Sequence, residues 1–221
     1  MSFLSYAWNW LTAAQQWHGS DGVPTRVLQH LGYTGVAMLV ATIIALPLGI
    51  AIGHTGRGGF AVINAANVWR AIPTLGLLIL LVVLIGFSVL VWLVPLVALA
   101  IPPILVNAYA GVAGVDPDLK DAAHGMGMTR WQVLRKVEIP MAIPLIMLGL
   151  RTAAIFVVAT ATIAAYIGLG GLGRFIIDGL ASNDYPQVAG GAAVVVVLAL
   201  AVQFFFVGLR RLVVSPGLRG Q

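Results

Sequence analysis

The residues from Ala71 to Val115 form an uninterrupted run without a charged side chain. A helix needs about 20 apolar residues to cross the hydrocarbon core of a bilayer, so this run is much too long for one span. Gly86–Ser88 is the natural place for a break, which predicts two spans at about 61–85 and 89–112. This feature favours a chain built from membrane-spanning helices.

The composition of the whole chain is that of an integral membrane protein. Of its 221 residues, 60% are hydrophobic and 9% are charged, whereas a soluble domain has about 25% charged residues. The mean hydropathy is +1.01. The formal net charge of +5 does not indicate nucleic acid, because the basic residues are sparse and scattered among apolar runs. The chain has no cysteine, which excludes disulfides and Cys-based metal or redox chemistry.

Five helical spans are predicted within a transmembrane domain at 25–213, with a loop at 116–140 between the third and the fourth. Pro140 is expected to mark a turn or the first position of a new helix. Residues 1–24 are predicted to lie at the membrane interface, and 214–221 to form a cytoplasmic tail. The predicted spans are 27–53, 61–85, 89–112, 141–167 and 188–209. The interfacial tryptophans are Trp8, Trp10 and Trp17.

The charges outside the spans predict the orientation. One arrangement of five spans gathers most lysines and arginines on one side, which the positive-inside rule makes cytoplasmic. The N-terminus is then outside, the C-terminus is cytoplasmic, and the polar loop faces the cytoplasm. The basic residues on that side are Arg57, Lys120, Arg130, Arg135, Lys136, Arg210, Arg211 and Arg219.

The loop at 116–140 carries the signals of two short helices. Asp116 is placed to cap a helix that begins at Pro117. Two glycines then interrupt the pattern. Thr129 and Gln132 have the spacing of a capping box, which predicts the start of a second helix. The two helices are expected to lie at an angle to each other, at the surface of the membrane.

A spaced pattern runs through the same loop at Asp121, Ala122, Ala123, Gly127, Val137, Ile139 and Pro140. It resembles the cytoplasmic loop of bacterial ABC importer permeases, E-A-A-x3-G-x9-I-x-L-P, with three conservative substitutions. In that family the loop docks into a groove of the ATPase subunit. The resemblance implies an ATPase-coupling site formed by Asp121, Ala122, Ala123, Gly125, Gly127, Met128, Thr129 and Arg130.

The resemblance covers nearly the whole chain after residue 26. Its stretches look most like the osmoprotectant branch, which imports glycine betaine, choline, carnitine and related quaternary amines. Methionine-type permeases share the five-span size and a GGLG turn, so methionine or another small solute stays open as the alternative. The stretches are Arg70–Leu78, Pro102–Val112, Ala122–Ala153 and Ala161–Ile176.

This resemblance implies an all-α, type I importer permease in the cell (inner) membrane, surrounded by lipid. The implied partners are two ATPase subunits, which bind ATP and Mg, an extracytoplasmic substrate-binding protein, and a second permease chain, identical or paralogous. No cofactor is expected in this chain itself. It has no P-loop and no set of catalytic residues, so ATP hydrolysis is assigned to the separate subunit.

Two patterns that usually carry chemistry are set aside. The glycines Gly168, Gly170 and Gly173 have G-x-G-x-x-G spacing, but they follow a membrane span rather than a β-strand, so a dinucleotide site is excluded. An unwound turn with tight backbone contacts fits them better. The histidines lack the spacing of metal ligands, and no metal site is predicted; they are His18, His30, His54 and His124.

Residues in or beside the spans are candidates for the transport pathway or its gate. Prolines free backbone groups that only protein or a water-filled cavity satisfies at membrane depth, although plain helix kinks explain them equally well. Arg151 is the one charge within a predicted span and would repel a cationic substrate, so a structural or gating role is expected. The candidates are Pro73, Thr74, Pro102, Pro103, Asn107, Arg151, Gly170, Gly171 and Gly173.

Two other classes of function are weaker. A secondary transporter or channel working without ATP is expected to carry acidic residues for ion coupling, and every acidic residue here lies outside the predicted spans. A membrane-embedded enzyme needs a polar catalytic set at membrane depth, which the sequence lacks.

Overall fold

The computed structural model describes residues 3–70 and 72–214, and the regular structure in those ranges is helical, without a strand. Four helical segments are long and apolar enough to cross a membrane. Helices satisfy every backbone hydrogen bond internally, as a bilayer requires. The all-α membrane class is thus confirmed. The segments are α2 (Val23–Thr55), α5 (Val89–Ala113), Arg130–Ile167 and α10 (Tyr185–Val213).

The range predicted as the second span contains two helices rather than one. They are α3 (Gly59–Arg70) and α4 (Thr74–Ile85), each of 12 residues. At 1.5 Å per residue each is about 18 Å long, shorter than a hydrocarbon core of about 30 Å. Pro73 is the N-cap of α4, where it cannot donate a hydrogen bond to a continuing helix. A single helix at 61–85 was therefore wrong, and the count of five spans stays a prediction.

The fourth predicted span is part of a longer continuous segment. It comprises α7 (Arg130–Val133), the π-helical turn η2 (Leu134–Glu138), α8 (Ile139–Thr160) and the 3-10 helix η3 (Ala161–Ile167). Pro140 was expected to mark a turn or a helix start, but it lies inside this segment. Pro140 is the second residue of α8, and the wider η2 turn ends just before α8, with the Ile139 N–H bonded to the Leu134 carbonyl.

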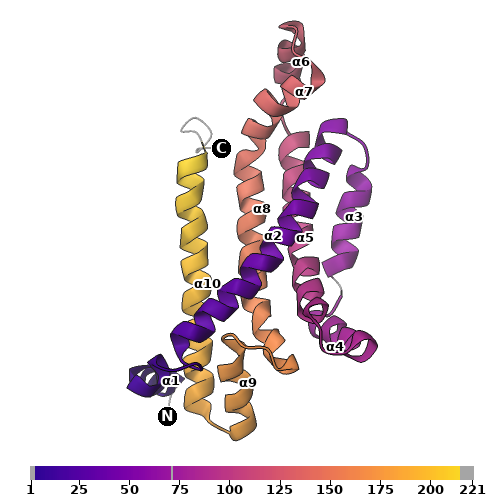
Figure 1. Cartoon of the computed structure of the whole chain (residues 1–221). Helices are drawn as coiled ribbons and strands as arrows, with labels where there is room; N and C mark the ends of the chain where they lie inside the picture. The colour runs from indigo at the N-terminus through magenta and orange to yellow at the C-terminus, as the bar shows by residue number, and fades with distance from the viewer. Residues whose placement is uncertain (1–2, 71, 215–221) are drawn as a thin grey trace. The chain divides into compact units, whose positions relative to one another are not determined.

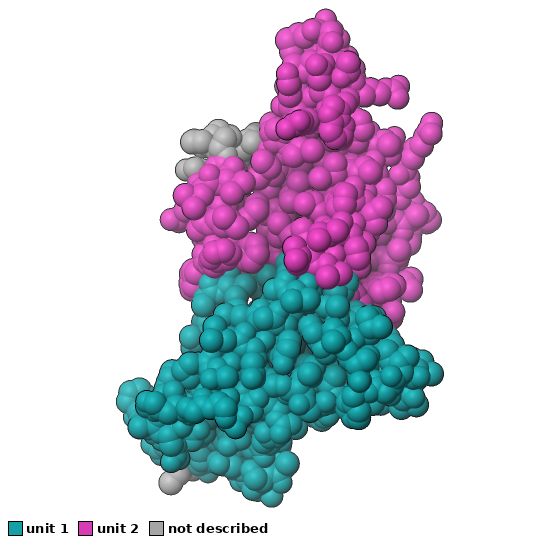
Figure 2. All heavy atoms as spheres, viewed as in Figure 1, with its two compact units in different colours: residues 1–38, 73–97, 154–202 teal, residues 39–72, 98–153, 203–221 magenta. Residues whose placement is uncertain are grey.

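The chain divides into two compact units, coloured separately in Figure 2, with boundaries inside α2, α5, α8 and α10. Unit 1 contains residues 1–38, 73–97 and 154–202, and unit 2 contains 39–72, 98–153 and 203–221. Most of the predicted tail 214–221 lies outside the described residues.

In unit 1, α1 (Phe3–Thr12) and α9 (Gly173–Ser182) contribute to an apolar core together with residues of α2, α8 and α10. The unit also contains η1 (Ala14–Trp17) and α4. Trp10 belongs to this core, with 4% exposure, and its place at the membrane interface stays a prediction. Its ring meets Phe175 edge-on at a centroid distance of 5.0 Å. Trp8 and Trp17 are exposed. The cluster also contains Val23, Val158, Leu172 and Leu198.

Unit 2 is held together by close helix approaches over small residues. A Cβ at Gly49 would lie 2.7 Å from the Leu105 carbonyl oxygen, and one at Gly53 would lie 2.8 Å from the Val112 Cβ. These two glycines, spaced four residues apart on α2, therefore allow α2 and α5 to approach closely. The core of unit 2 contains Ala108, Val112, Leu134, Ala142 and Ile146.

Candidate functional site

The loop at 116–140 folds as its capping signals predict. Helix α6 (Pro117–Gly125) begins after Asp116, whose Oδ1 accepts the Asp118 N–H at 2.9 Å. The capping box at α7 is complete: the Thr129 hydroxyl accepts the Gln132 N–H at 3.3 Å, and the Gln132 side chain accepts the Thr129 N–H at 2.8 Å. Figure 1 shows α6 and α7 at one end of α8, beyond the last turn of α5. Local hydrogen bonds therefore fix two short helices there.

A glycine makes the turn between these two helices. Gly127 has φ +81°, a conformation that costs an L-residue roughly 1–2 kcal/mol. A Cβ added to Gly127 would meet nothing within 4 Å, so the position needs glycine for its backbone and not for space. The Met128 N–H closes the turn on the Ala123 carbonyl at 3.2 Å.

The structure brings the predicted coupling residues together on one exposed element. Of α6, Ala123 alone is buried, with 1% exposure, and Met128 is half-buried. Two large apolar side chains of the same element are also exposed, Met126 at 72% and Trp131 at 65%. Sequence reasoning did not assign these two a site role, although large apolar residues in a polar segment are a usable signal. The remaining coupling candidates are exposed: Asp121, Ala122, Gly125, Gly127, Thr129 and Arg130.

A buried carboxylate lies beneath this surface. Glu138 is 2% exposed, and its Oε2 pairs with His54 Nδ1 at 2.5 Å while its Oε1 pairs with Lys120 Nζ at 3.3 Å. Lys120 also donates to the Val112 carbonyl at 3.3 Å. The cluster was missed from sequence, where His54 was counted only as lacking metal-ligand spacing. In the sequence, the one indication of this cluster was Glu138 itself, an acidic residue between the apolar Val137 and Ile139.

The pathway candidates of unit 2 are mostly packed residues. Pro102 and Pro103 are buried within α5, and Asn107 donates to the Pro103 carbonyl at 2.7 Å. Arg151 is half-buried on α8 and donates from Nε to the Gln203 side chain at 2.7 Å. Arg151 is the one of these four residues that lines a cavity of about 680 Å³, and Arg210 lines the same cavity. The other walls come from α5, α6 and apolar residues of α8 and α10.

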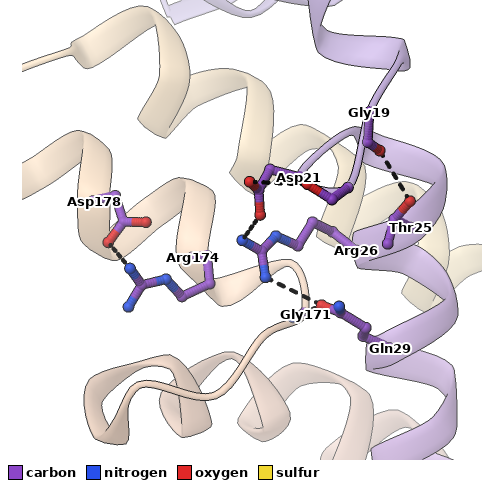
Figure 3. A network of polar contacts seen from close by, with 9 residues as sticks. Gly19, Asp21, Thr25, Arg26, Gln29, Gly171, Arg174 and Asp178 are labelled. Carbon is purple, nitrogen blue, oxygen red and sulfur yellow. Dashed lines mark hydrogen bonds and ion pairs between the residues drawn. The ribbon is translucent and has the colours of Figure 1, made fainter.

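In unit 1, a polar network holds the glycine turn that precedes α9 (Figure 3). Gln29 of α2 accepts the Gly171 N–H at 2.8 Å and an Arg26 Nη1–H at 3.1 Å with the same oxygen. Arg26 also pairs with Asp21. Asp178 pairs with Arg174 at 2.9 Å, one turn along α9. Sequence reasoning missed Gln29 because it lies 142 residues before its partner.

The glycines of this turn are required by close packing. A Cβ at Gly170 would lie 2.1 Å from the Gln29 oxygen, and one at Gly173 would lie 2.0 Å from the Thr162 carbonyl oxygen. Gly171 has φ +89°. The tight turn expected here in place of a dinucleotide site is thus confirmed. Pro73 and Thr74, the other candidates of unit 1, cap and begin α4.

No cluster of three or more His, Cys, Asp or Glu side chains that could hold a metal occurs within residues 3–70 and 72–214. The geometry offers an exposed element of two short helices, a buried ion-pair cluster beneath it, and a cavity lined in part by Arg151, Arg210 and Asp116.

Comparison with known proteins finds a matching family, similar curated proteins and a similar solved structure. The model of a family described as "Binding-protein-dependent transport system inner membrane component" matches residues 22–219. The chain is 38% identical to the glycine betaine/carnitine/choline transport system permease protein OpuCB of Bacillus subtilis over 192 residues, 87% of this chain and 88% of that protein. It is 40% identical to the carnitine transport permease protein OpuCB of Listeria monocytogenes over 176 residues, 80% of this chain and 81% of that protein. The inward-facing MetNI methionine ABC transporter matches with a TM-score of 0.73 at 25% identity, covering 87% of this chain and 96% of that one.

Proposed function

The chain belongs to the family of binding-protein-dependent transport system inner membrane components, and we propose that it is the permease of an ATP-driven importer of osmoprotectant quaternary amines. Glycine betaine, choline and carnitine are the proposed substrates. The main support for this proposal is the 38% identity, over 87% of the chain, to a permease whose name includes all three of these amines. Methionine has less support, because the methionine transporter is 25% identical.

The protein is a multi-pass inner-membrane transport subunit, and it works with an ATPase and a substrate-binding protein. It is not itself an enzyme, because ATP hydrolysis lies in a separate subunit of such transporters. In the proposed complex, two ATPase subunits hold ATP and Mg. A second permease chain, identical or paralogous, completes the pathway.

The α6–α7 element is the proposed docking site for the ATPase. Its support is physical: both helices are capped, so they keep their shape when exposed, and Met126 and Trp131 offer apolar area to a partner. Asp121, Ala122 and Gly125 are exposed on the same element. Closure of the ATPase pair on ATP then moves α6 and α7 and switches the permease between inward- and outward-facing states. ATP must bind the two states with different affinities for this to work.

The proposed orientation places the docking element in the cytoplasm and the N-terminus outside. It is supported by the lysines and arginines of the loop and by Arg210 and Arg211 in the last turn of α10. The charged residues that line the cavity are Arg151, Arg210 and Asp116, and the excess of positive charge does not suit tight binding of a quaternary ammonium. The proposed substrate recognition therefore lies on the separate binding protein, with the permease as the route.

Uptake of radiolabelled glycine betaine and choline into proteoliposomes tests this function. The permease is reconstituted with its ATPase and binding protein, and ATP is varied on the ATPase side. ATP-dependent uptake of either amine, competed by unlabelled carnitine, is the expected result. Assembly of a complex that transports methionine and neither amine would overturn the substrate assignment and keep the family. Amine uptake without ATP would overturn the mechanism.

A further inference from the structure

The buried carboxylate of Glu138 joins four helical elements of unit 2 at one point. Its two oxygens take different partners, His54 in the last turn of α2 and Lys120 in α6. The same Lys120 ammonium reaches the carbonyl of Val112 in the last turn of α5. Glu138 itself ends η2, directly before α8. The ends of α2 and α5 and the start of α8 are thereby tied to α6.

Few other side chains hold α6 to the rest of unit 2. Of its nine residues only Ala123 is buried, and Lys120 is half-buried. The Lys120 side chain is 23% exposed, and that of Glu138 is 3% exposed. This ion pair resists being pulled apart, because separation would leave the buried Glu138 carboxylate charged and without the Lys120 ammonium. A displacement of α6 is therefore expected to move Glu138 with it, because the ion pair between Lys120 and Glu138 stays closed.

We propose that Glu138 is a positioning residue that transmits the movement of α6 to the membrane helices α2 and α8. This inference rests on the proposed docking of the ATPase at α6 and α7. Docking uses the exposed side of the element, whereas transmission uses the buried ion pairs, so the two roles are separable. Loss of the Glu138 charge leaves the docking surface and the continuous segment from α7 to α8 in place, and it removes the ion pairs that link α6 to the end of α2 and the start of α8.

The test measures amine molecules taken up per ATP hydrolysed in proteoliposomes, together with the amount of ATPase that co-purifies with the permease. For Glu138→Gln, which keeps the shape of the side chain, we expect normal co-purification and a ratio at least about fivefold lower, the lower end of typical coupling between sites. Lys120→Met is expected to do the same. Lys136→Met is the matched control. Lys136 is exposed in η2, so this substitution also removes one lysine charge but leaves the ion pair between Glu138 and Lys120 intact.

A double variant tests that the two residues act as one unit. The combined Glu138→Gln and Lys120→Met variant is expected to lower the ratio no further than either single variant, because neighbours in one network are not additive. An unchanged ratio in an assembled Glu138→Gln complex would overturn the proposal. If that variant fails to accumulate, the half-buried Lys120→Met decides, and a ratio equal to that of Lys136→Met overturns it.

Docking is tested separately with Met126→Asp, which places a charge on the exposed apolar surface. Both proposals are supported if Met126→Asp no longer co-purifies with the ATPase, while Glu138→Gln co-purifies normally and takes up less amine per ATP hydrolysed. Normal ATPase binding by Met126→Asp overturns docking at this surface whatever Glu138 does. Loss of binding by Met126→Asp with an unchanged ratio in Glu138→Gln overturns transmission alone.

Discussion

Gln29 accepts a hydrogen bond from the backbone N–H of Gly171 at 2.8 Å, so a side chain of α2 holds the turn that leads into α9. The same oxygen accepts from Arg26. No other residue type of this length offers one uncharged carbonyl oxygen to two donors. The turn therefore depends on one side chain as much as on its glycines.

Replacing Gln29 by alanine is expected to destabilise unit 1. The change leaves the Gly171 N–H without its acceptor, and a buried donor left unpaired costs about 1–3 kcal/mol. Thermal unfolding of the detergent-solubilised protein measures the effect as a lower midpoint. Gln15→Ala is the control, because Gln15 is exposed on the N-terminal segment. Equal midpoints for the two variants would show that the hydrogen bond does not hold the turn.

Gly173→Ala is expected to be more damaging than a substitution at a glycine with open surroundings. Its Cβ would lie 2.0 Å from the Thr162 carbonyl oxygen, which forces α9 or η3 to shift, at a typical overpacking cost of about 1–3 kcal/mol. Gly76→Ala in α4 meets nothing closer than 3.5 Å and serves as the control. Yield and melting temperature of the two proteins provide the comparison. A Gly173→Ala protein as stable as Gly76→Ala would contradict the packing argument.

Gly127→Asp is expected to uncouple ATP hydrolysis from uptake without preventing membrane insertion. The side chain has open space, so the variant bears only backbone strain of roughly 1–2 kcal/mol and a new charge beside the proposed docking surface. Gly56→Asp is a matched control, since Gly56 also has positive φ and open surroundings but lies after α2. Uptake and ATP hydrolysis are measured in the same proteoliposomes. Normal uptake by well-expressed Gly127→Asp counts against the docking role.

Arg151→Met is expected to raise choline uptake relative to that of glycine betaine. Choline is a cation and glycine betaine a zwitterion, so the Arg151 charge at the cavity disfavours choline more strongly. At a separation of about 10 Å and an effective dielectric constant near 20, the repulsion is roughly 1–2 kcal/mol, which corresponds to about tenfold. Dual-label uptake gives the ratio directly. Gln203→Leu removes the hydrogen-bond partner and keeps the charge, so its ratio should stay that of the unaltered protein.

The loop at 116–140 was predictable because its determinants are local. Asp116 caps α6 through a residue two positions on, and Thr129 and Gln132 cap each other three positions apart. The range 61–85 was predicted less well, since hydropathy does not register where a helix stops. Pro73 was the local sign of the break between α3 and α4, but a proline in an apolar run is compatible with a kinked helix as well as with a helix end.

The sequence by itself determined a helical membrane protein with a capped polar loop. Apolar runs and capping residues act within a turn or two, so they can be recognised without knowing the partners. Tertiary structure alone decided which charge meets which. His54 pairs with Glu138 across 84 positions, and Gln29 meets Gly171 across 142. Such pairs form only when separate helices pack side by side, because distance in space and not spacing along the chain sets the energy of an ion pair or a hydrogen bond.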